Sequence, residues 1–176
     1  QFESSSDISS LPMVAMLSGF SDSGSVIGQL SDHFFSSLKH ELVVRFDNDE
    51  LLDYRSRRPT LFFEKDHIES YEPATLAIYL VWDEAGQPFL LLDGYEPDMR
   101  WEAFARAVTQ FCTDNDVQSF TWVHAIPFPI PHTRPTGITV SGNREDMIAR
   151  FSEWKPQTLS ACLMRVRGTL DAVLQD

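Results

Sequence analysis

The chain has 176 residues, of which 43% are hydrophobic, and a formal net charge of −12. This length and composition fit one compact domain with a sizeable core, and the negative charge opposes binding to nucleic acid or to an anionic membrane surface. Because no apolar run approaches the roughly 20 residues of a membrane-spanning helix, we expect a soluble, cytoplasmic protein with no nucleic-acid or membrane partner.

The first ten residues are polar and offer apolar surface only at Phe2 and Ile8. A segment of this kind cannot offset its ordering entropy by burial. We therefore expect a flexible tail over residues 1–10 and a single domain over residues 11–176.

A strand, a turn and a helix are expected next. The apolar run Leu11–Leu17 indicates a buried strand, and the glycine-bearing turn Gly19–Gly24 follows it. Apolar residues then recur at helical spacing, at Ile27, Leu30, Phe34 and Leu38. Leu42–Phe46 indicates a second strand, which makes a βαβ crossover the natural interpretation.

The middle of the chain alternates between surface and sheet. Asp47–Pro59 is polar and is expected to cross the surface. Thr60–Glu64 can form a short strand, and Leu76–Trp82 with Pro88–Leu92 indicates two adjacent strands joined by a tight turn. A hairpin inside a βα pattern implies a mixed sheet.

The second half is expected to return to helix and sheet. Asp98 can cap a helix whose apolar stripe is Trp101, Phe104, Val108 and Phe111. Further expected elements are a strand over Phe120–Ala125, a last strand over Gly137–Val140, and helices over Glu145–Phe151 and Leu159–Leu174. The sum is an α/β protein, with three α/β/α layers and a mixed, mainly parallel sheet.

One loop presents two charged side chains between prolines. Pro131 and Pro135 flank His132, Thr133 and Arg134, so the backbone around the imidazole and the guanidinium has little freedom. Such a rigid, charged loop is typical of a surface that faces a ligand, a partner or a buried ion pair.

Four short segments, in this order, resemble the bacterial branch of the proteasome assembly chaperone 2 family. They are Gly19–Gly24 (GFSDSG), Arg58–Thr60 (RPT), Gly94–Phe104 (GYEPDMRWEAF) and Pro131–Pro135 (PHTRP). The resemblance implies a three-layer α/β/α fold similar to that of phosphorylase-like and hydrolase-like enzymes. It also implies a tendency to form homo-oligomers.

The chain departs from the family's pattern in two places. The family's first turn commonly reads Gly-Trp-Asn-Asp-Ala-Gly, and this chain differs at Phe20 and Ser21. After a segment similar to Ser152–Pro156, family members usually continue into a second long α/β stretch, whereas residues 157–176 indicate a terminal helix. Either the chain is a truncated member, or a connecting part is absent from the sequence.

Eight positions in the four segments are candidates for binding a ligand or partner: Gly19, Asp22, Gly24, Arg58, Glu96, Arg100, His132 and Arg134. The resemblance suggests that the charged ones gather near one edge of the sheet. The turn before the first helix exposes amides that suit an anion, although Asp22 or Ser23 can instead cap that helix. Arg134 offers a bidentate fork and His132 a proton donor or acceptor, although Glu96 can equally join a structural ion-pair network.

No metal, cofactor or catalytic residue is predicted. The histidines and cysteines match no metal-binding spacing, and Asp47–Asp53 lacks the arrangement of a calcium loop. A nucleophile elbow at Ser21 would need glycine at Ser23.

The favoured function is a non-catalytic, assembly-chaperone-like interaction protein that self-associates and has a protein client. The alternative is a small-anion-binding module, or a phosphorylase- or hydrolase-like enzyme with a His132/Arg134 site. Family members that dock on the proteasome end in a hydrophobic residue, a tyrosine and any residue. This chain ends in Leu174–Asp176 (LQD), so that docking is not expected.

Overall fold

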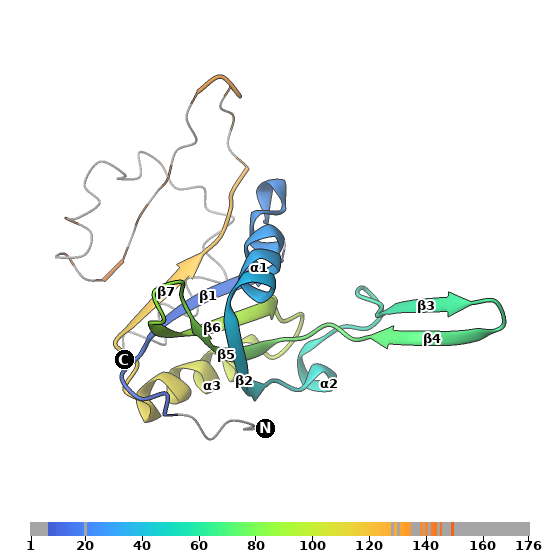
Figure 1. Ribbon diagram of the computed structural model, residues 1–176, viewed down its shortest axis with the longest axis horizontal. Coiled ribbons are helices and arrows are strands. Elements are labelled where there is room, and N and C mark those ends of the chain that lie inside the picture. The colour runs from blue at the N-terminus through green and yellow to red at the C-terminus, as the bar shows by residue number, and fades with distance from the viewer. Residues whose placement is uncertain are drawn as a thin grey trace.

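A computed structural model describes residues 7–19 and 21–127, together with positions 129, 131–134, 138, 140, 142–143, 145 and 149. Within them the chain is an α/β protein with a five-stranded mixed sheet and a separate two-stranded hairpin (Figure 1). The elements in chain order are β1 (Pro12–Ser18), η1 (Ser23–Ser25), α1 (Val26–Ser37), β2 (Lys39–Arg45), α2 (Asn48–Leu51), β3 (Thr60–Glu64), β4 (His67–Glu72), β5 (Ala77–Trp82), β6 (Pro88–Tyr95), α3 (Trp101–Asp114) and β7 (Ser119–Val123).

The strand order in the large sheet is β2-β5-β6-β1-β7. β1 pairs in parallel with both β6 and β7, whereas β5 is antiparallel to β6 and to β2. Four of the five strands therefore point the same way, and β1, β2, β6 and β7 all end at one edge of the sheet. The crossover through α1 carries the chain from β1 to β2 past two intervening strands.

Alternating side chains of the strands build a core on each face of the sheet. On one face Met13, Leu90 and Leu92 pack with Phe104 and Val108 of α3. On the other face Met16 and Leu91 pack with Ile27, and Leu30 and Phe34 of α1 lie against them. Because neighbouring strand residues point to opposite faces, α1 and α3 cover opposite sides of the sheet.

Most of the expected elements in the first 127 residues are confirmed. The strands around Leu11–Leu17, Thr60–Glu64 and Phe120–Ala125 form, as do the two amphipathic helices. The tight turn of the β5–β6 hairpin is closed by a hydrogen bond from the amide of Asp83 to the carbonyl of Gln87 at 3.0 Å.

Four features differ from the expectation. β4 and the short α2 were not predicted, and β2 begins at Lys39 rather than at Leu42. The prediction that Asp98 caps the following helix is wrong. The residue before α3 is Arg100, with a left-handed φ of 56° and no side-chain cap, while the carboxylate of Asp98 bonds to a neighbouring loop.

Both ends of the chain extend past the described residues. Of the expected N-terminal tail, residues 7–10 are described, and the amide of Ser10 donates to the carbonyl of Asn115 at 2.9 Å. The strand expected over Gly137–Val140 and the helices expected over Glu145–Phe151 and Leu159–Leu174 lie, apart from single positions, outside the described residues. The division into a tail and one domain stays a prediction.

Candidate functional site

The carboxyl ends of β1, β2, β6 and β7 bring four connections to one edge of the sheet. These are the turn Gly19–Gly24 after β1, the segment Asp47–Pro59 after β2, the loop Glu96–Arg100 after β6, and residues 124–134 after β7. In α/β proteins this edge is where ligands usually bind. All eight candidate positions lie on these connections, so the edge is the candidate site.

Gly19 and Glu96 meet at the centre of this edge. The amide of Glu96 donates to the carbonyl of Ser18 at 2.8 Å, which joins the ends of β1 and β6. A Cβ atom at Gly19 would overlap the carboxylate of Glu96. Glycine at position 19 therefore leaves room for the Glu96 side chain beside the end of β1.

Asp22 accepts hydrogen bonds from the start of the helix that follows it. Its Oδ1 accepts a hydrogen bond from the amide of Ile27 at 3.0 Å, and its carbonyl accepts one from the amide of Ser25 at 3.1 Å. Gly24 has a φ of +71°, which glycine adopts without strain. A carboxylate already occupies the N-terminus of α1, and it would repel a second anion there.

A polar cluster formed by Asp53, Arg57 and Asp98 joins two of the connections. The carboxylate of Asp98 contacts the guanidinium of Arg57 at 2.8 Å and accepts from the amide of Asp53 at 2.9 Å. The amide of Asp98 donates to the carbonyl of Leu51 at 2.8 Å. The loop after β6 is thereby fastened to the segment after β2.

Tyr95 lies beneath this cluster. Its ring is 4% exposed and its hydroxyl donates to Oδ1 of Asn48 at 2.7 Å, while the Asn48 amide donates to the carbonyl of Ala74 at 2.7 Å. The guanidinium of Arg57 lies 5.5 Å from the centre of the ring. Burial raises the pKa of Tyr95 to about 12, with smaller contributions from Tyr54 and Asp98. The hydroxyl therefore stays protonated and keeps its donor role at neutral pH.

The remaining charged candidates lie on the surface. Arg100 forms an ion pair with Glu50, and more than half of each side chain is exposed. His132 and Arg134 are exposed on a turn closed by a hydrogen bond from the amide of Arg134 to the carbonyl of Pro131 at 3.0 Å. Arg58 is exposed too, and among the described residues neither it, His132 nor Arg134 has an ion-pair partner.

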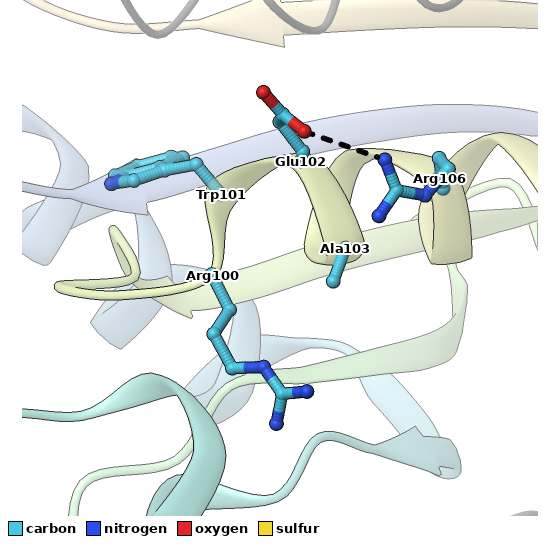
Figure 2. A pocket seen from close by; sticks show the side chains of 5 residues that line it. All are labelled: Arg100, Trp101, Glu102, Ala103 and Arg106. Carbon is cyan, nitrogen blue, oxygen red and sulfur yellow. Dashed lines mark ion pairs between the residues drawn. The ribbon is translucent and has the colours of Figure 1, made fainter.

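Two hollows beside α3, in the described part of the surface, are poor candidates for a ligand site. One of about 190 Å³ lies between α2 and α3, with Phe46, Leu51 and Phe104 among its lining residues. Ligand pockets typically measure ~300–1,000 Å³. A wider one of about 460 Å³ lies at the start of α3. Figure 2 shows that Arg100 and Ala103 there point away from Trp101 and Glu102. Its side chains therefore do not converge on one point.

The described part of the chain has neither a metal-binding cluster nor a membrane-spanning helix. There, no group of three or more His, Cys, Asp or Glu side chains is placed to hold a metal ion. No helix in the same part is long and apolar enough to cross a bilayer.

The residues that hold the edge together are mostly ones that the sequence did not single out. Arg57, rather than its neighbour Arg58, reaches Asp98, and Asn48, Asp53 and Tyr95 complete the contacts. Tyr95 and Asp98 do lie inside the recognised segment Gly94–Phe104. The local sequence does not distinguish Arg57 from its neighbour Arg58, because the tertiary structure determines which of the two side chains reaches Asp98.

Asp93 is a half-buried acid on the face of the sheet that α1 covers. Its carboxylate accepts a hydrogen bond from the hydroxyl of Ser31. Burial raises the pKa of Asp93, the bond from Ser31 lowers it and the charge of Asp32 raises it, and the net shift is upward from 3.8. Ionised Asp93 therefore destabilises the fold at neutral pH.

Asp93→Asn is expected to raise the free energy of unfolding at pH 7, since the amide oxygen can still accept from Ser31. A folded pKa above the unfolded value means that stability is lost as pH rises from 3.8 through the raised value. The advantage of the variant should thus shrink as pH falls through that window and vanish below it. Thermal unfolding of both proteins between pH 3 and 8 measures this, and a variant that is less stable at pH 7 contradicts it.

Comparisons with known proteins agree on one family. The model of the PAC2 family matches residues 16–169. A Corynebacterium glutamicum protein of unknown function superposes with a TM-score of 0.85 at 31% identity, over 99% of this chain and 64% of that one. A Mycobacterium tuberculosis protein of unknown function gives 0.82 at 37% identity, over 91% of this chain and 57% of that one.

A second Mycobacterium tuberculosis structure, described as a proteasome-assembly chaperone homologue, has a TM-score of 0.74 at 20% identity and shares the fold. The match covers 85% of this chain and 64% of that one. This chain thus spans less than two thirds of the length of these three solved relatives. No curated protein matches it.

Proposed function

The chain belongs to the PAC2 family, and from that premise we propose that it is a non-catalytic interaction protein of the assembly-chaperone type. It associates with copies of itself and with a protein client. The observation that carries this proposal is the Asp53–Arg57–Asp98 cluster at the carboxyl edge of the sheet. Its charged groups are occupied by one another and by backbone amides at the place where an α/β enzyme would hold its substrate.

Two further observations support binding of a protein at the surface over binding of a small ligand in a pocket. The carboxylate of Asp22 accepts a hydrogen bond from an amide in the first turn of α1. It therefore occupies the anion site that the glycine turn would otherwise offer. The Glu50–Arg100 pair and the exposed side chain of Met99 lie on the outer surface beside α3. Exposed charge next to exposed apolar surface is typical of the rim of a protein interface.

The finer description of the fold belongs to the same proposal. A three-layer α/β/α sandwich agrees with the position of α1 and α3 on opposite faces of the sheet. Similarity to phosphorylase-like or hydrolase-like folds would be analogy, and no reaction is built on it.

The alternative of a small-anion-binding module, or an enzyme, with a His132/Arg134 site stays a prediction from the sequence. Both side chains are exposed and have no ion-pair partner among the described residues. Exposure of this kind serves an interface as well as it serves a ligand, so it favours neither function.

Light scattering of the purified chain over a hundredfold range of concentration tests the proposal. We expect a mass at least twice that of one chain at the upper end, and co-purification of a discrete protein from the native cytoplasm. A single-chain mass at every concentration together with an empty pull-down would remove the proposed function.

A further inference from the structure

An apolar hollow lies between α2 and the first turns of α3. Its apolar lining comes from Phe46, Leu51, Ala103, Phe104 and Ala107. The rings of Phe46 and Phe104 meet edge to face with their centres 5.1 Å apart, and Leu51 and Phe104 belong to the main core, so the floor of the hollow is rigid. The two alanines lie one turn apart on α3 and leave open the space that larger side chains would fill.

The size of the hollow suits one large side chain of another protein. Its volume is about 190 Å³. That is less than the ~300–1,000 Å³ of pockets that enclose whole small molecules, whereas an apolar cavity of ~150 Å³ can take up a benzene ring. A leucine, methionine or phenylalanine side chain therefore fits. Side chains that fill such hollows are the ones that contribute most to the affinity of protein interfaces.

The rim of the hollow is acidic on the side of α2. Asp47 and Glu50 line the hollow, Asp49 lies between them in the chain, and all three residues are exposed. Arg100 is the one basic residue in the lining, and it pairs with Glu50. The rim therefore has a net negative charge, which complements basic side chains next to the residue that enters the hollow.

We propose that the hollow between α2 and α3 takes one large apolar side chain of the protein client, and that basic side chains beside this anchor meet Asp47 and Glu50. The inference deepens the proposed function and rests on it, since it names the surface and the chemistry by which a client binds. The same surface continues into the wider hollow, which shares Arg100 and Ala103 with the narrower one, and Figure 2 shows both side chains on the same side of the helix start.

A defined peptide tests the anchor. The probe is an alanine-based helical peptide with a single leucine and a lysine one turn to either side of it, added to the isotope-labelled chain. We expect amide chemical shifts of Ala103 and Ala107 to move with a Kd of roughly 1 mM. A peptide with alanine in place of the leucine should bind at least about tenfold more weakly, because the apolar burial is lost. Glutamates in place of the lysines should weaken binding by about threefold to tenfold.

Filling the hollow from within is the second test. Ala107→Leu places a larger apolar side chain in the lining, whereas Gln110→Leu places the same side chain at an exposed position of α3 outside the lining. We expect Ala107→Leu to weaken binding of the leucine peptide, and recovery of the co-purifying client, by at least about tenfold, and Gln110→Leu by less than about twofold. Thermal unfolding should show both variants folded, with Ala107→Leu at least as stable as the parent, since leucine covers apolar surface there.

A matched pair of acids tests the charge of the rim. Glu50→Gln should weaken binding of the leucine peptide by about threefold at low salt, because the rim loses one negative charge. Glu102 lines the wider hollow alone, so Glu102→Gln should change the affinity by less than about twofold. Equal affinities of the parent and both variants would contradict the proposed role of the acidic rim.

The outcomes separate this inference from the proposed function. A parent that binds no peptide at the hollow, and whose client is recovered equally well by Ala107→Leu, overturns the hollow and leaves client binding standing. Leucine and alanine peptides that bind equally well overturn the apolar anchor. A parent that binds no peptide, with amide shifts in Ala107→Leu that extend into residues 150–176, makes this chain's own segment the occupant and overturns the client. A parent that binds no peptide, captures no client and keeps a single-chain mass at every concentration overturns both.

Discussion

Gly94→Ala is expected to lower the free energy of unfolding by about 2–5 kcal/mol, since both backbone strain and a steric clash oppose a side chain there. Gly94 has a φ of +141°, in a region that residues with a Cβ atom rarely adopt. The added Cβ would lie 2.7 Å from the Cα of Leu76 and would overlap the carbonyl oxygen of Thr75. Neither is the flexible end of a side chain, so the strand must move.

Gly28→Ala is the matched control for this prediction. Gly28 lies inside α1, and a Cβ atom there has nothing within 4 Å. The same substitution should therefore stabilise the protein by about 0.5–1 kcal/mol, because alanine favours the helix. Urea unfolding of the two variants measures the contrast, and equal midpoints would show that the close approach at Gly94 is wrongly placed.

Asp98→Ala is expected to cost about 2–3 kcal/mol of unfolding free energy. The carboxylate is 19% exposed, and its removal leaves the Asp53 amide and the Arg57 guanidinium without their acceptor. Losing one partner of a partly buried ion pair costs more than the pair contributes, because the remaining charge stays out of water. Arg57 is 34% exposed, which keeps the expected loss below that of a fully buried pair.

Glu102→Gln provides the comparison for Asp98. Glu102 pairs with Arg106 at 3.6 Å one helical turn away, and both side chains are well exposed. Removing that pair should change stability by less than about 0.5 kcal/mol. Equal losses in the two variants would mean that the Asp98 cluster is an ordinary surface ion pair.

Local patterns in the sequence were enough to find the elements that face a core. The run Leu11–Leu17 and the stripe of Trp101, Phe104, Val108 and Phe111 point to burial, and β1 and α3 form there. The sequence does not predict the strand β4, because its residues are exposed and mix polar with apolar side chains. It also does not predict that β2 lies at the edge of the sheet, since the order of strands along the chain does not fix their order in space.

The gathering of the charged candidates into one site stays a prediction. The connections that carry them do follow strands that end at the same edge of the sheet, because β1, β6 and β7 run in the same direction. What each residue contacts depends on loop geometry that local pattern does not encode. Asp98 was expected to cap α3, yet it holds Arg57 and the Asp53 amide instead.

The β3–β4 hairpin is a further case in which the local sequence pattern predicts a strand but not how that strand is paired. Thr60–Glu64 was expected as a short strand, and it forms as β3. Its pairing with β4 and the apolar face that results appear only in the register of the two strands. The apolar face of the hairpin is thus a consequence of pairing rather than of composition.

Hydrogen exchange of the backbone amides at low and high protein concentration tests most directly whether the protein works by associating with copies of itself. The account predicts that a set of surface amides gains protection of tenfold or more at high concentration, while amides of the central strand β6 exchange equally slowly in both samples. Surface amides that all exchange at the same fast rates in both samples would contradict it.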